Sequence, residues 1–147
     1  GERLKERNPD LYVVGIEPLS SPVLSGGDPG PHKIQGIGPG FVPEVLNRDV
    51  IDEIVPVDDE DALELARLCA RREGVLAGIS GGAALWAAIH VGSRPEMSGK
   101  RMAVIIPDSG ERYVSTPFFA AWPARSMPAN ARRRSAGPGS ASRRPPR

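Results

Sequence analysis

Three short segments of the chain hold residue types from which a small-molecule site could be built. Residues 36–40 read Gly-Ile-Gly-Pro-Gly, and glycines let a backbone approach a ligand closely. Residues 78–83 place Ser80 ahead of two glycines, where a helix is expected to begin and its N-terminus could face a ligand. Residues 107–113 open with Pro107 and Asp108, at the end of an expected strand. Each segment also has an ordinary interpretation, as a tight loop, a helix N-cap and a turn respectively.

Other reactive residue types give weaker signals. Residues 36–40 do not match the dinucleotide-binding fingerprint, because the third glycine comes one residue early and no strand precedes it. Lys33 could in principle form an imine, but nothing apolar surrounds it that would depress the pKa of its amine. Cys69 falls on an apolar helical stripe, which favours a packed thiol. His32 and His90 have no partner at metal-ligand spacing, so no metal site is expected.

Expected strands and helices alternate along residues 12–106. Residues 12–18 and 51–57 are short apolar runs that predict buried strands, and residues 101–106 predict a third. Residues 18–44 are rich in glycine, proline and serine, which predicts a long loop with at most one helical turn. The alternation indicates a parallel sheet, and such sheets place ligands just beyond the C-terminal ends of their strands.

Two helices are expected between the second and third strands. The first begins at the acidic run of residues 58–61, which supplies an N-cap, and ends at Gly74; the second begins at a cap formed by Ser80. Apolar residues spaced at i, i+3, i+4 and i+7 give each helix one buried face. These residues are Ala62, Leu65, Ala66 and Cys69 in the first helix, and Ala84, Ala87, Ala88 and Val91 in the second.

Charge divides the chain into two parts. Of its 19 basic residues, seven are arginines in residues 120–147, which contain no acid, and the other 12 are set against 18 acidic residues in residues 1–119. Residues 120–147, the arginine-rich tail, consist mainly of Ala, Arg, Pro, Ser and Gly, a composition that predicts disorder. With 147 residues, the chain is expected to form a single domain or part of one.

The sequence contains no apolar stretch long enough to span a membrane, and its first residues lack the layout of a signal peptide. We therefore expect a cytoplasmic protein that does not enter a membrane. The single cysteine cannot form an internal disulfide, which agrees with a reducing compartment.

Three motifs, at residues 31–43, 74–83 and 107–116, resemble three consecutive motifs of cysteine synthases, also called O-acetylserine sulfhydrylases, in both order and spacing. The resemblance covers residues 1–119. Two features depart from the family pattern: Gly81 stands where a second serine is usual, and the arginine-rich tail is foreign to the family.

The resemblance implies an α/β fold: part of the three-layer parallel-sheet domain of the tryptophan synthase β-like, fold type II, pyridoxal-phosphate enzymes. It implies that Ser80 hydrogen-bonds the pyridine nitrogen of pyridoxal 5'-phosphate, that Gly36 lies beside the substrate, and that Pro107 and Asp108 lie near the ring. In the family, the Schiff-base lysine, the substrate-binding asparagine loop and the phosphate cradle all come earlier than the position of Gly1. Residues 1–119 are therefore interpreted as the C-terminal part of the catalytic domain, inactive as given, with residues 120–147 as a disordered tail.

The resemblance further implies that the intact enzyme makes L-cysteine from O-acetylserine and sulfide by β-replacement, as a homodimer, with serine acetyltransferase as a candidate partner. A neutral serine beside the pyridine nitrogen, at a positive helix N-terminus, disfavours ring protonation, which suits β-elimination better than transamination.

Two alternatives stay open. Cystathionine β-synthase shares the cofactor, the fold and a Pro-Asp-Ser motif at residues 107–109, although the continuation Gly-Glu-Arg-Tyr at residues 110–113 favours cysteine synthase. A protein of another class would be a non-catalytic remnant whose basic tail binds nucleic acid or an acidic partner. Nucleic-acid binding is not expected, because the tail has no lysines among its arginines and no stacking aromatic other than Trp122.

Overall fold

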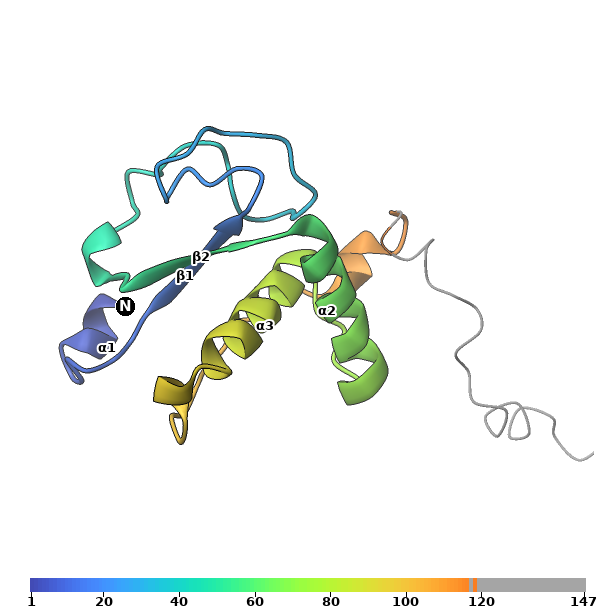
Figure 1. Cartoon of the computed structure of the whole chain (residues 1–147). Helices are drawn as coiled ribbons and strands as arrows, with labels where there is room; N and C mark the ends of the chain where they lie inside the picture. The colour runs from blue at the N-terminus through green and yellow to red at the C-terminus, as the bar shows by residue number, and fades with distance from the viewer. Residues whose placement is uncertain (117, 119–147) are drawn as a thin grey trace, which may run out of the picture.

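The computed structural model of the chain describes residues 1–116 and 118. Its centre is a two-stranded parallel sheet of β1 (Val14–Pro18) and β2 (Glu53–Val57), in which Val14 lies opposite Glu53 and Pro18 opposite Val57 (Figure 1). Both predicted strands are confirmed, and each is shorter than its apolar run. Proline cannot donate to a ladder, and Pro56 is accordingly exposed in β2.

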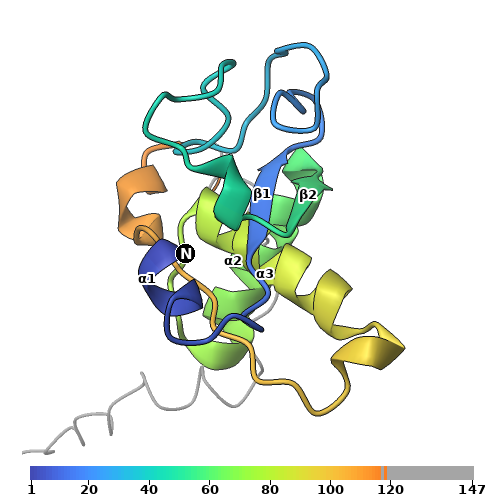
Figure 2. The same ribbon diagram turned by 90° about the vertical axis from the view of Figure 1, so that its left-hand side faces the viewer.

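A long loop joins the two strands and covers one face of the sheet. It stands above the strands in Figure 1 and again in the view turned by 90° (Figure 2). Residues 19–47 contain turns but no helix, which confirms the predicted loop. Short helices flank the sheet: α1 (Glu2–Lys5) precedes β1, and the 3-10 helix η1 (Arg48–Val50) precedes β2. The loop places Gly38 against Pro18, the last residue of β1.

Helix α2 (Asp59–Glu73) begins and ends where the sequence predicts. The Asp58 side chain accepts a hydrogen bond from the Glu60 amide at 2.9 Å, and Gly74 ends the helix in the left-handed conformation with φ of 70°. The buried face differs from the prediction: Leu63 is buried with Ala62 and Ala66, whereas Leu65 and Cys69 are only partly buried. The face has turned because α2 packs mainly against α3, which lies between it and the sheet.

Helix α3 (Ile79–Gly92) lies beneath both strands and beside α2 (Figure 1). Its core residues are Ala83, Ala87 and Val91, while the predicted Ala84 and Ala88 are partly buried. The two helices touch closely at Gly82, where a Cβ atom would lie 2.0 Å from the Ala62 carbonyl oxygen. A glycine is therefore required where α3 crosses α2.

The predicted third strand at residues 101–106 is wrong for this structure, since residues 101–107 have no regular secondary structure. A strand needs a hydrogen-bonded neighbour, and neither β1 nor β2 lies alongside this segment. The segment runs along α3 instead: Met102 adjoins Gly92 and Ile106 adjoins Gly81. The Ile105 side chain is 78% exposed, so no described residue covers this apolar part of the segment.

Two further 3-10 helices complete the described part: η2 (Pro95–Met97) follows α3, and η3 (Gly110–Tyr113) follows the extended segment. Among the residues that the structure describes, no helix is long and apolar enough to cross a membrane. The arginine-rich tail, for which the sequence predicts disorder, lies outside the described residues.

Candidate functional site around the start of helix α3

Ser80 lies in the first turn of α3, two residues further into the helix than predicted. The N-cap is Gly78, whose backbone is extended (φ −72°, ψ 177°) and whose carbonyl accepts from the Gly82 amide at 3.0 Å. The predicted Ser80 cap is therefore wrong, because Ser80 already has helical neighbours on both sides. Its hydroxyl makes no hydrogen bond to any other described residue, although Ser80 is only 3% exposed.

The Ser80 hydroxyl faces Gly36, a residue 44 positions away in the sequence. Gly36 has a positive φ of 96°, and a Cβ atom built on it would lie 3.5 Å from the Ser80 Oγ atom. Gly38 and Gly40, two and four residues further along the loop, also have positive φ angles, of 62° and 82°. The structure thus brings together two of the predicted site residues, with no side chain on Gly36 between its backbone and the Ser80 hydroxyl.

Asp108 lies against the same helix start from another direction. Its carbonyl oxygen accepts from the Gly78 amide at 3.1 Å, and its Oδ2 atom accepts from the Tyr113 hydroxyl at 2.6 Å. Its Oδ1 atom is buried and has no hydrogen-bond partner among the described residues. Pro107 precedes it and is exposed. Sequence reasoning missed the supporting role of Tyr113, although the motif that carries Asp108 includes this tyrosine.

A buried carboxylate at the end of β1 holds the loop that leads to Gly36. Glu17 is 2% exposed, and its oxygens accept from the Leu24 amide at 2.7 Å, the Ser25 amide at 3.1 Å and the Ser25 hydroxyl at 2.5 Å. Sequence reasoning missed Glu17 as well. Its one signal is an acid that directly follows an apolar run and precedes a proline.

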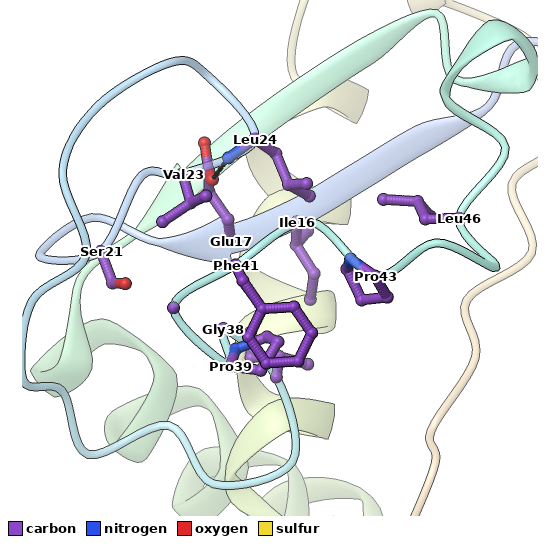
Figure 3. Close-up of a pocket in the computed structure, with 12 residues that line it drawn as sticks. Ile16, Glu17, Ser21, Val23, Leu24, Gly38, Pro39, Phe41, Pro43 and Leu46 are labelled. Carbon is purple, nitrogen blue, oxygen red and sulfur yellow. Dashed lines mark hydrogen bonds between the residues drawn. The ribbon is translucent and has the colours of Figure 1, made fainter.

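A cavity of about 180 Å³ lies between β1 and the loop (Figure 3). Ile16, Leu24, Phe41 and Leu46 surround it with apolar atoms, and Glu17 bonds to the Leu24 amide at its edge. Neither Ser80 nor Gly36 lines this cavity. It is therefore distinct from the site at the start of α3.

Lys33, His32, His90 and Cys69 are not part of the site. Glu60 holds the Lys33 amine at 2.9 Å and raises its pKa above the ordinary value, the opposite of what a nucleophilic amine needs. The Nε2 atom of His32 lies 2.8 Å from the Gly38 carbonyl oxygen, and the His90 ring stacks on Trp86 at 5.1 Å. The Cys69 thiol is partly buried and unpaired with another cysteine.

The start of α3 suits a flat heteroaromatic ligand with a neutral ring nitrogen. The Ser80 hydroxyl, which makes no hydrogen bond among the described residues, can donate to such a nitrogen, and the missing Cβ of Gly36 keeps the volume of one methyl group open beside it. The first N–H groups of a helix have no partners within the helix, so they add positive potential there. These residues fit the pyridine ring that the sequence resemblance implies.

Residues 1–108 match the family model described as pyridoxal-phosphate dependent enzyme. The chain belongs to this family, whose cofactor is pyridoxal phosphate, and the resemblance stated from its motifs is confirmed.

Among its relatives, the chain is 48% identical over 120 residues to a cysteine synthase of Staphylococcus aureus, a match that covers 82% of this chain and 38% of the relative. It superposes on a crystal structure of cysteine synthase from Entamoeba histolytica with a TM-score of 0.80 and 40% identity, covering 81% of this chain and 35% of the other. An O-acetylserine dependent cystathionine β-synthase from Helicobacter pylori gives a TM-score of 0.68 at 40% identity, with 78% and 37% covered. The α/β fold with a parallel sheet is thus confirmed, and the chain spans well under half the length of these relatives.

Proposed function

We propose that the chain is the C-terminal part of a cysteine synthase, whose intact form makes L-cysteine from O-acetylserine and sulfide. The observation that carries this proposal is that the Ser80 hydroxyl, which has no hydrogen-bond partner among the described residues, faces Gly36 at the start of α3. The 48% identity to a cysteine synthase supports the same reaction. Cytoplasmic localisation, a homodimeric assembly and a serine acetyltransferase partner belong to the proposal as well.

Pyridoxal phosphate, when bound, withdraws electrons from the substrate's Cα and so permits loss of the β-acetoxy group. In our proposal the Ser80 hydroxyl donates a hydrogen bond to the pyridine nitrogen and orients the ring. Serine carries no charge and does not hold a proton on that nitrogen. The positive N-terminal end of α3 further disfavours protonation of the nitrogen. Gly36 leaves room for the substrate, and Pro107 and Asp108 border the ring.

We further propose that the 147-residue chain alone is inactive. Ser80 offers one neutral hydrogen bond, a contribution of about 0.5–1.5 kcal/mol, which is too little to retain a cofactor. Lys33 is held by Glu60, and Lys5 by Asp52 at 2.6 Å. The exposed Ile105 and Met102 also favour association of the chain with other molecules. Residues 1–119 then form part of the catalytic domain, and residues 120–147 are a dispensable tail.

The proposal can be tested with a completed enzyme, made by replacing the matching segment of the S. aureus cysteine synthase with this chain. We expect the completed enzyme to bind pyridoxal phosphate and to release cysteine from O-acetylserine and sulfide. The 147-residue chain, given the same reagents, should show no visible cofactor absorbance that borohydride can fix to the protein. Cysteine production by the chain alone, with cofactor fixed on Lys33, would refute its assignment as an inactive part.

A second candidate function is that of a cystathionine β-synthase, supported by the similarity to the H. pylori enzyme and by the Pro-Asp-Ser motif at residues 107–109. The two functions differ in the nucleophile. Supplying the completed enzyme with homocysteine or sulfide, each with O-acetylserine, separates them. A kcat/KM larger with homocysteine than with sulfide would select the second function. Cofactor binding with neither product would instead favour the non-catalytic alternative.

A further inference from the structure

The backbone around Asp108 is tied directly to the residues that precede α3. The Gly78 amide donates to the Asp108 carbonyl at 3.1 Å, and the Gly110 amide donates to the Leu76 carbonyl at 2.9 Å. Between them, Ala77 and Ser109 form an antiparallel bridge. The position of Asp108 is therefore coupled to the residues from which the first turn of α3 starts.

The Asp108 side chain fills the space beside the N-cap of α3. A Cβ atom on Gly78 would lie 1.9 Å from the Asp108 Oδ1 atom and 2.6 Å from its Cγ atom, distances that no real side chain could adopt. The carboxylate can lie there only because residue 78 is glycine. A negative charge at this position also interacts favourably with the positive end of the helix.

Tyr113 fixes the Asp108 carboxylate from the other side. The tyrosine is 5% exposed, packs edge-on against Phe118 at 6.0 Å, and donates its hydroxyl hydrogen to Oδ2 at 2.6 Å. Burial, followed by the hydrogen bond to Asp108, raises the pKa of Tyr113 to about 12, so the hydroxyl remains a donor at neutral pH. The second oxygen, Oδ1, is buried and has no hydrogen-bond partner among the described residues, which is uncommon for a buried polar atom.

We propose that Asp108 is a positioning residue: held by Tyr113 and seated against Gly78, its carboxylate fixes the first turn of α3 and so orients the Ser80 hydroxyl toward the space beside Gly36. This inference rests on the proposed function, in which that hydroxyl binds the pyridine nitrogen. Asp108 borders the ring in the proposed function, but in this inference it makes no bond to the cofactor or the substrate and acts through Ser80. Its removal should therefore affect the site only while Ser80 is present.

The contact between Asp108 and Gly78 is tested first in the 147-residue chain. Replacing Gly78 with alanine creates a steric overlap, and we expect Gly78→Ala to lower the melting temperature by about 5–15 °C. In an Asp108→Ala background the same substitution should lower it by less than half as much, because the overlapping atoms are gone. Gly92→Ala, at the far end of α3 beside the flexible Met102, is the matched control and should show no dependence on residue 108. Equal effects of Gly78→Ala in both backgrounds would overturn the proposal.

The positioning role is tested in the completed enzyme by titrating cofactor-free protein with pyridoxal phosphate. Ser80→Ala should raise the apparent dissociation constant about fivefold, the value of one hydrogen bond. Asp108→Ala should raise it about threefold or more, and Ser80→Ala/Asp108→Ala should bind no more weakly than Ser80→Ala alone. Asp108→Asn, which keeps the shape and an acceptor for Tyr113, should restore binding to within about twofold of the unmutated enzyme.

The outcomes separate this inference from the function on which it rests. If Ser80→Ala leaves the dissociation constant and the cofactor spectrum unchanged, the proposed function itself fails. If Ser80→Ala weakens binding but Asp108→Ala does not, or if the two effects multiply in the double variant, only the positioning role fails. A fall in melting temperature without any change in cofactor binding would show that Asp108 is purely structural, and this too would overturn the proposal.

Discussion

Arg94 holds the carboxylate of Glu53 with both of its terminal nitrogens, at 2.6 and 2.8 Å. The contact ties the segment that follows α3 to the first residue of β2, 41 positions earlier in the sequence. The Tyr12 hydroxyl donates to the same carboxylate at 3.0 Å. Helix α3 is thus fixed at both ends, by Asp108 at its start and by Glu53 beyond its finish.

The pair between Arg94 and Glu53 makes part of the stability dependent on pH. The hydrogen bonds from Arg94 and then from Tyr12 hold the pKa of Glu53 below its ordinary value of 4.5. A depressed pKa adds stability that is complete above the unfolded-state pKa and is lost as the pH falls through the folded-state pKa. We expect Arg94→Ala to lower the melting temperature at pH 7, and the difference from the unmutated chain to shrink below pH 4.5. A difference that stayed constant down to pH 3 would contradict the ion pair.

The buried carboxylate of Glu17 should be required for the long loop to fold. Glu17→Ala leaves the Leu24 and Ser25 amides without their acceptor, at a cost of about 2–4 kcal/mol in the free energy of unfolding. Denaturant unfolding followed by circular dichroism measures the loss. Glu64→Ala, an exposed acid on α2, is the control and should change stability by less than about 0.5 kcal/mol. Equal stability of the two variants would show that Glu17 does not anchor the loop.

The elements that local signals specify could be predicted from the sequence. The apolar runs of β1 and β2, the Asp58 cap and the Gly74 stop depend on a few adjacent residues, and each is confirmed. The helical start at Ser80 was misplaced because the N-cap depends on a distant pairing, in which Gly78 bonds to Asp108. Residues 101–106 have the composition of a strand, but composition cannot supply the neighbour that a strand requires.

The candidate site could be predicted only in part. Neither periodicity nor spacing reveals that Gly36 adjoins Ser80, since the contact closes a long loop, and the motif resemblance alone placed both residues at one site. The burial of Glu17 depends on the loop folding back onto β1, and the Tyr113 contact with Asp108 depends on the turn at η3. Such contacts follow from tertiary structure, and no property of a single segment indicates them.

The arginine-rich tail, residues 120–147, should be dispensable. Its composition offers no apolar face that could offset the entropy of ordering it. Deleting it from the completed enzyme should leave the melting temperature unchanged and should alter the rate of cysteine formation by less than about twofold. A large loss of stability or activity on deletion would show instead that the tail packs on the enzyme or binds a partner.

A side chain at Gly36 should weaken substrate binding, for a reason that the backbone conformation of this residue does not explain. Gly36→Ala and Gly26→Ala both place alanine at a positive φ, of 96° and 89°, at a similar cost of about 1–2 kcal/mol. Only at Gly36 does the new Cβ atom face the Ser80 hydroxyl; at Gly26 no atom lies within 4 Å. We expect both variants of the completed enzyme to lose similar stability, and only Gly36→Ala to raise the KM for O-acetylserine. A raised KM in both would trace the effect to the backbone.

The charge of residue 80 should decide how the cofactor works. An aspartate at this position would accept a hydrogen bond from the protonated pyridine nitrogen, and its negative charge would keep the ring protonated. The neutral serine hydroxyl does not do this. We therefore expect Ser80→Asp in the completed enzyme to alter the visible absorbance of the bound cofactor and to slow cysteine formation at least about tenfold, or about 1.4 kcal/mol of barrier. Ser98→Asp adds the same charge at an exposed position beyond α3 and should leave both properties unchanged. If Ser80→Asp matched the unmutated enzyme in absorbance and in turnover, Ser80 could not be the residue that faces the pyridine nitrogen.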